Sequence, residues 1–245
     1  MGWIYCMMSG IVISNKYSNA RDRLKGNLIV GFTLVEMSII LVIIGLIIGG
    51  VLAGKDLVYD AKIKRLAQEM QGVQLGIQVF IDKYNWLPGD MPTAEASAYG
   101  FSSGGTGNYG DSLIECCSTN ENRWAWMQLG QAGLITLQPT GGHNIYSEVW
   151  DASGYRVGNN SSLGNRLQFA GYTTTQPSPF PALTPHEAEK LDKILDNGQP
   201  GSGNMRISSG NGIGSTGCVT PHPNPTAYRY DVSGRACVAY IKIGY

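Results

Sequence analysis

The stretch GFTLVE at residues 31–36 leads into eighteen residues, 37–54, that carry no charge. A helix built from a run of this length and composition can cross a lipid bilayer. A carboxylate inside such a helix costs about 2.5–3.5 kcal/mol at mid-depth and less near the interface. Glu36 is therefore expected to have a functional partner rather than to be an incidental acid.

This stretch resembles the processing signal of prepilins, the precursors of type IV pilins, minor pilins and the pseudopilins of type II secretion. The resemblance implies that a prepilin peptidase cleaves after Gly31 and methylates the new amino terminus at Phe32. It also implies that Glu36 pairs with the Phe32 nitrogen of a neighbouring subunit, which would offset the cost of burying the carboxylate in lipid. In the alternative reading, Glu36 reaches the head-group region of an ordinary signal anchor.

The residues before the predicted cleavage site are basic. Residues 1–31 contain four basic residues and one acidic residue, a net charge of +3. By the positive-inside rule, this end stays in the cytoplasm, and the bulk of a single-pass inner-membrane protein lies in the periplasm. Residues 32–245 contain 14 basic and 17 acidic residues, a net charge of −3, which predicts no basic patch and no nucleic-acid partner.

The sequence predicts three segments: a cytoplasmic leader at 1–31, a long helix at 32–84 and a globular head at 85–245. Within the helix, residues 32–54 are expected to span the membrane and residues 55–84 to be amphipathic. Apolar side chains recur every three or four positions in the second part, at Tyr59, Ile63, Leu66, Met70, Val73, Ile77, Phe80 and Tyr84. A soluble coiled coil would show the same period, but the attached apolar run favours a helix that packs on the head.

The head is expected to be α+β, with a small antiparallel sheet, a loop-rich insert at 97–122 and a short helix at 124–135. The β-rich runs lie at 146–149, 166–174, 204–207 and 236–243. A further helix is predicted between Thr184 and Gly198, because Thr184 and Glu187 form a capping-box pattern around Pro185.

Four cysteines lie after the predicted cleavage site: Cys116, Cys117, Cys218 and Cys237. Disulfides persist in the periplasm, whereas Cys6 is lost with the leader. The resemblance to the carboxyl-terminal disulfide loop of pilins implies a Cys218–Cys237 bond. Cys116 and Cys117 could then form a vicinal bond or remain free, and a crossed pairing of the four cysteines stays open.

No metal or cofactor is expected. The cysteines lack the Cys-x-x-Cys spacing of zinc sites, and Asp111 and Glu115 lack the alternating carboxylates of a calcium loop. His143, His186 and His222 are scattered, and no nucleophile elbow, HExxH helix or phosphate-binding loop is present, so an enzyme is not predicted.

The resemblance therefore implies a structural subunit of a type IV pilus or type II secretion pseudopilus, displayed at the cell surface after assembly. The size of the head favours a minor pilin or minor pseudopilin. The implied partners are the prepilin peptidase, other pilin or pseudopilin subunits, the inner-membrane assembly platform and membrane lipid. The alternative is a single-pass anchored binding or hydrolytic domain, which needs neither Gly31 nor Glu36.

Overall fold

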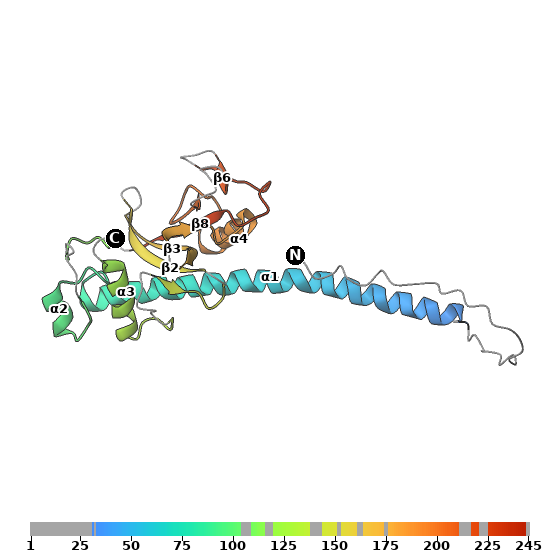
Figure 1. Cartoon of the computed structure of the whole chain (residues 1–245), viewed down its shortest axis with the longest axis horizontal. Helices are drawn as coiled ribbons and strands as arrows, with labels where there is room; N and C mark the ends of the chain where they lie inside the picture. Colours follow the sequence, from blue (N-terminus) through green and yellow to red (C-terminus); the bar gives the residue numbers. More distant parts are fainter. Residues whose placement is uncertain are drawn as a thin grey trace, which may run out of the picture. The chain divides into compact units, whose positions relative to one another are not determined.

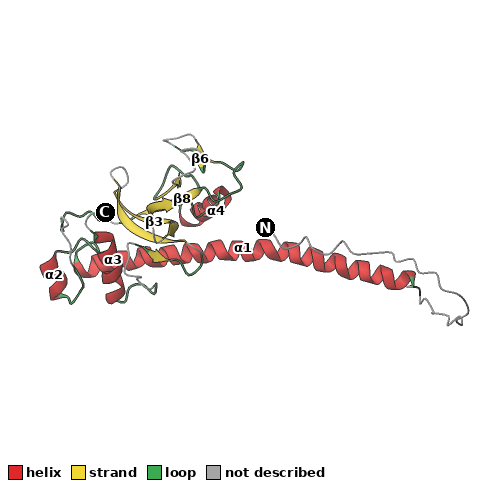
Figure 2. Cartoon of the chain, viewed as in Figure 1, coloured by secondary structure: helices red, strands yellow, loops and turns green. Residues whose placement is uncertain are grey.

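The structure is a computed structural model that describes residues 31, 33–103, 109–115, 120–137, 144–150, 153–160, 164–173, 176–210, 217–220 and 225–243. The protein is α+β, with a long helix near the amino terminus and a small antiparallel sheet (Figures 1 and 2). The chain divides into two compact units, Met1–Gly50 and Val51–Tyr245. Helix α1 (Leu34–Tyr84) contributes residues to both units.

The first unit exposes an apolar helix surface. Leu34, Leu41 and Leu46 have exposed fractions of 86%, 70% and 72%. Such a surface is stable when lipid or protein covers it rather than water. Among the described residues, α1 is the one helix that is long and apolar enough to cross a membrane.

In the second unit, the apolar stripe of α1 forms one wall of the core. The buried members of the stripe are Ile63, Leu66, Met70, Val73, Ile77 and Phe80, and the partly buried ones are Tyr59 and Tyr84. They pack in one cluster with the inner face of the sheet. The apolar residues that recur every three or four positions in the sequence are therefore the ones that face the core, as predicted.

The turn after α1 requires a glycine. Gly89 has a φ of +89°, and its N–H donates to Oε1 of Gln128 over 2.7 Å. A Cβ atom at this position would lie 2.2 Å from the carbonyl oxygen of Glu121. The backbone conformation and the close approach therefore both exclude a larger residue.

Two short helices follow this turn, α2 (Thr93–Ala98) and α3 (Glu121–Gln131). The sequence did not predict α2, which is only six residues long and lacks a side-chain N-cap. The helix predicted at 124–135 begins three residues earlier, and Gly133, with a φ of +68°, follows its end. Trp126 and Leu129 of α3 are buried in the main core.

The main sheet has six strands, and every pairing is antiparallel. They are β1 (Ile145–Tyr146), β2 (Ser153–Asn160), β3 (Gly164–Thr173), β4 (Gln176–Phe180), β5 (Met205–Ser209) and β8 (Cys237–Lys242). The order is β1-β2-β3-β8-β5, and β4 pairs with the end of β3. Strand β8, which ends at Lys242, therefore lies between β3 and β5.

The predicted strand at 146–149 is wrong beyond Tyr146. The Ser147 hydroxyl accepts hydrogen bonds from the N–H groups of Val149 and Trp150, each over 3.1 Å, which turns the chain away from the sheet. Side-chain hydrogen bonds of this kind compete with strand pairing.

Helix α4 (Pro185–Leu195) has the predicted capping box. The Thr184 N–H donates to Glu187 Oε2 over 2.7 Å, and the Glu187 N–H donates to Thr184 Oγ1 over 3.3 Å. Lys190 of this helix donates to Asp60 of α1 over 2.6 Å. A second sheet contains the two short strands β6 (Val219–Thr220) and β7 (Ala227–Tyr228).

Candidate functional site

The residues singled out by the sequence lie at the start of α1, where Thr33 and Glu36 bind each other. Glu36 Oε2 accepts hydrogen bonds from the Thr33 N–H over 2.8 Å and from the Thr33 hydroxyl over 2.9 Å. The Glu36 N–H donates in return to Thr33 Oγ1 over 3.2 Å. This reciprocal arrangement is a capping box, with Thr33 as the N-cap of a helix that begins at Leu34.

The capping box gives Glu36 a local role that was not predicted. The signal was present in the sequence, because Thr33-Leu34-Val35-Glu36 has the Ser/Thr-x-x-Glu spacing that correctly predicted the cap of α4. A carboxylate in the first helical turn is also favoured by the partial positive charge of the helix N-terminus. These two local effects lower the cost of placing an acid at this end of an apolar helix.

Gly31 is exposed, and a Cβ atom built on it would have no atom of the described residues within 4 Å. Phe32, the predicted new amino terminus and methylation site, lies outside the described residues.

The second predicted feature is the bond between Cys218 and Cys237, and the structure contains it. The two Cα atoms are 5.1 Å apart, and both residues are buried in the main core. The bond attaches the start of the β6–β7 hairpin to β8, an interior strand of the main sheet. It therefore forms a covalent link between the two sheets, whose strands do not pair with each other.

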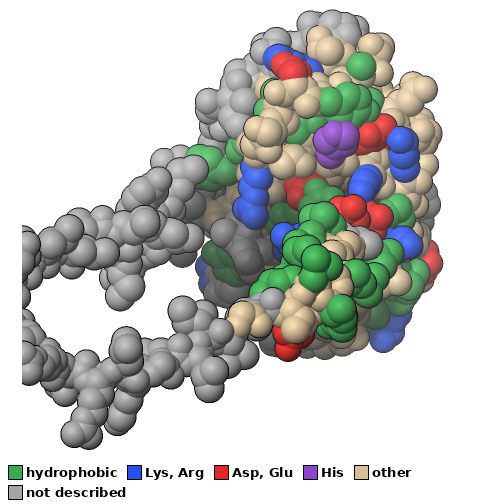
Figure 3. All heavy atoms as spheres, turned by 90° about the vertical axis from the view of Figure 1, so that its right-hand side faces the viewer, with side chains coloured by type: hydrophobic (Ala, Val, Ile, Leu, Met, Phe, Trp, Pro, Cys, Tyr) green, Lys and Arg blue, Asp and Glu red, His purple; other side chains and the backbone are tan. Residues whose placement is uncertain are grey.

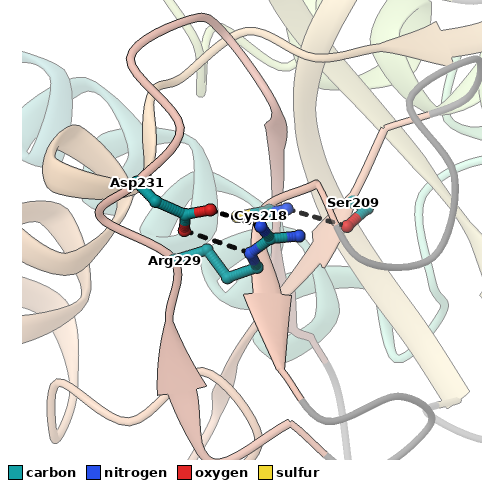
Figure 4. A network of polar contacts seen from close by, with 4 residues as sticks. All are labelled: Ser209, Cys218, Arg229 and Asp231. Atoms are coloured by element: carbon teal, nitrogen blue, oxygen red, sulfur yellow. Dashed lines mark hydrogen bonds and ion pairs between the residues drawn. The ribbon is translucent and has the colours of Figure 1, made fainter.

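Hydrogen bonds fix the chain around this disulfide (Figure 4). The Cys218 N–H donates to Ser209 Oγ of β5 over 3.0 Å, and the Arg229 N–H donates to the Cys218 carbonyl oxygen over 2.9 Å. Arg229 also forms an ion pair with Asp231. These contacts fix the backbone on both sides of Cys218. Cys116 and Cys117, whose pairing the sequence left open, lie outside the described residues.

Asp111 and Glu115, whose spacing does not match a calcium loop, lie in a segment that two buried carboxylates hold in place. Asp90 accepts hydrogen bonds from the backbone N–H groups of Gly110, Asp111 and Ser112. Glu121 Oε2 accepts from the Glu115 N–H over 2.7 Å. Within the described part of the chain, no group of three or more His, Cys, Asp or Glu residues is placed to hold a metal ion.

Burial raises the pKa of both of these carboxylates. It raises the pKa of Asp90 to about 6, although three N–H donors oppose the shift, and it raises the pKa of Glu121 to about 7. The charges of Asp90, Glu115 and Asp111 add to the shift of Glu121. Its second oxygen, Oε1, is buried, and no described residue forms a hydrogen bond with it.

The three histidines are not brought together by any described contact. The His186 ring lies 4.8 Å from the Tyr230 ring, centroid to centroid, while His143 and His222 lie outside the described residues.

The fold thus defines an α+β protein whose amino-terminal helix is long and apolar enough to span a membrane. Comparison of the chain with family models, curated proteins and solved structures finds no match.

Proposed function

We propose that this chain is a prepilin-type filament subunit of the minor pilin or minor pseudopilin class. The observation that carries the proposal is the stretch GFTLVE at 31–36, positioned directly at the start of α1. The first turns of this helix expose apolar side chains, and its later turns pack into a globular core. A membrane tether for a binding or hydrolytic domain would need only the apolar run.

In this proposal, a prepilin peptidase cleaves the bond between Gly31 and Phe32. The glycine itself supports this step, because Gly31 has no side chain to obstruct a protease at the cleaved bond. The basic leader remains in the cytoplasm, and the head is exported to the periplasm before assembly. The chain's own part in these steps is structural, so the proposal assigns it no catalytic residue.

The geometry of Glu36 is compatible with a second role in assembly. Its Oε2 atom is engaged by Thr33, and no described residue binds Oε1. Oε1 can therefore accept the ammonium group of a neighbouring Phe32 without breaking the capping box. In an environment of low dielectric constant, that charge pair would be stronger than in water and would favour the assembled state.

Glu36→Gln tests the proposal, because glutamine also serves at this position of a capping box. The variant removes the charge while keeping the local hydrogen bonds. We expect it to be processed after Gly31 and inserted in the membrane, but to be lost from sheared filaments and from crosslinks to other subunits. Asp56→Asn, which removes an exposed carboxylate further along α1, is the matched control and should assemble normally.

Equal assembly of Glu36→Gln and the parent protein would contradict the charge-pair role. The anchored binding or hydrolytic domain would then be the better account of the chain.

A further inference from the structure

The two faces of the main sheet have different compositions. Alternate residues of β2, β3, β5 and β8, such as Tyr155, Leu167 and Ile241, belong to the core with α1. The intervening residues point to the opposite side, which we call the outer face. A separate cluster on that face contains Ala170, Tyr172 and Val238, with Tyr240 packed against it.

The outer face is basic. Its cations are Arg156, Arg166, Arg206 and Lys242, and the four strands that carry them contain no Asp or Glu. Arg166 is directly opposite Lys242 across the β3–β8 pairing, and Tyr240 of β8 is directly opposite Arg206 of β5. By contrast, acidic and basic side chains are interspersed on the face drawn in Figure 3.

Arg166 is a partly buried cation without a carboxylate partner among the described residues. Its guanidinium carbon lies 4.6 Å from the centroid of the Tyr240 ring. Burial lowers the pKa of Arg166, and the described groups that oppose this effect are the hydroxyls of Tyr240 and Tyr172. A guanidinium that contacts the face of an aromatic ring can still direct N–H groups to an anion.

Tyr172 adds an independent observation. It is only 4% exposed, and no described residue forms a hydrogen bond with its buried hydroxyl. The guanidinium carbon of Arg156 lies 4.8 Å from its ring centroid, and the charges of Arg156 and Arg166 both act on its hydroxyl. A buried hydroxyl that lacks a hydrogen bond costs free energy, and a bound oxyanion could supply that hydrogen bond.

We propose that the outer face of β3 and β8 binds a tetrahedral oxyanion, a phosphate or sulfate group. Arg166 would bind the anion through its planar N–H edge, and Lys242 would add a second charge from the neighbouring strand. Tyr240 positions Arg166, and its own hydroxyl is fixed by Gln168 over 3.3 Å and by Ser208 over 3.2 Å. The oxyanion could be free in solution or attached to a polymer. The inference does not depend on the proposed filament role.

The test is calorimetric titration of the full-length protein in nonionic detergent micelles at constant ionic strength. The probes are inorganic phosphate and dextran sulfate, with uncharged dextran as the blank. We expect at least one anionic probe to bind and Arg166→Gln to weaken it at least tenfold. Arg235→Gln, which removes an exposed cation outside these strands, should bind as the parent does.

Two further variants separate recognition from folding. Arg166→Lys keeps the charge but not the planar fork, so its affinity should lie between those of the parent and Arg166→Gln. Lys242→Gln changes an exposed side chain that folding does not need, and it should weaken binding several-fold. Binding of phosphate indicates a free anion, and binding of dextran sulfate alone indicates a polymer. Failure of both probes to bind the parent, or equal binding by Arg166→Gln and Arg235→Gln, would overturn the proposal.

Discussion

At the scale of single residues, the start of α1 depends on Thr33 as much as on Glu36. Thr33 supplies both the hydroxyl that accepts the Glu36 N–H and the N–H that binds the Glu36 carboxylate. In the structure Glu36 caps its own helix. If the proposed pairing with a neighbouring Phe32 also holds, substitutions at Glu36 act through two mechanisms.

Thr33→Ala separates these mechanisms, because it removes the N-cap hydroxyl and leaves the carboxylate. Losing such a cap typically costs about 0.5–2 kcal/mol. We therefore expect faster hydrogen exchange of the amides in the first turn of α1 in micelles, while Thr33→Ser should exchange like the parent. Identical exchange in Thr33→Ala and Thr33→Ser would show that the capping box contributes nothing measurable.

Glu121 gives the head a pH-dependent stability. Its folded-state pKa is raised to about 7 by burial, above the ordinary value of 4.5, so the folded protein binds this proton more tightly than the unfolded chain does. The resulting stabilisation is fully present below about pH 4.5 and is lost as the pH rises through about 7. Asp90, with its pKa raised to about 6, changes stability in the same direction.

Glu121→Gln tests this dependence, because the amide oxygen can still accept the Glu115 N–H. We expect the parent to lose on the order of 1–2 kcal/mol of unfolding free energy from this group between pH 5 and pH 8. The variant should show a flatter profile, measured by urea denaturation at each pH. An equally steep profile in Glu121→Gln would assign the pH dependence to other groups.

At the scale of elements, the Cys218–Cys237 bond holds the β6–β7 hairpin to the main sheet. Breaking such a bond typically destabilises a domain by about 2–4 kcal/mol. Cys237→Ser should therefore lower the denaturant midpoint of the full-length protein, while Cys6→Ser in the leader should not. Peptide mapping without reductant should recover Cys218 linked to Cys237. Recovery of Cys218 linked to Cys116 or Cys117 would contradict the pairing.

The elements that could be predicted from sequence are those with a strong period or a cap. The stripe from Ile63 to Phe80 and the capping box of α4 left little ambiguity. Strand β2 was missed because its sequence, SGYRVGNN, is rich in Gly and Asn, which are depleted in strands. Strand β4 was missed because it contains two prolines, which sheets tolerate mainly in edge strands.

At the scale of the whole molecule, the net charge does not reveal that basic residues gather on one face of the main sheet. A net charge of −3 over residues 32–245 predicted no basic patch. The pairing of β2, β3, β5 and β8 nevertheless places four cations on one face without an acid in those strands. This arrangement could not be predicted, because it requires both the missed strand β2 and the register of β3 against β8.

The proposed function also makes a claim about the whole chain, namely that it matures by losing residues 1–31. Mass spectrometry of the protein purified from its native membrane tests this claim most directly. We expect the mature chain to begin at Phe32 with one added methyl group, and Gly31→Leu to remain uncleaved, because its side chain would obstruct the peptidase. An intact amino terminus at Met1 in the parent, or cleavage after the apolar run, would contradict the account.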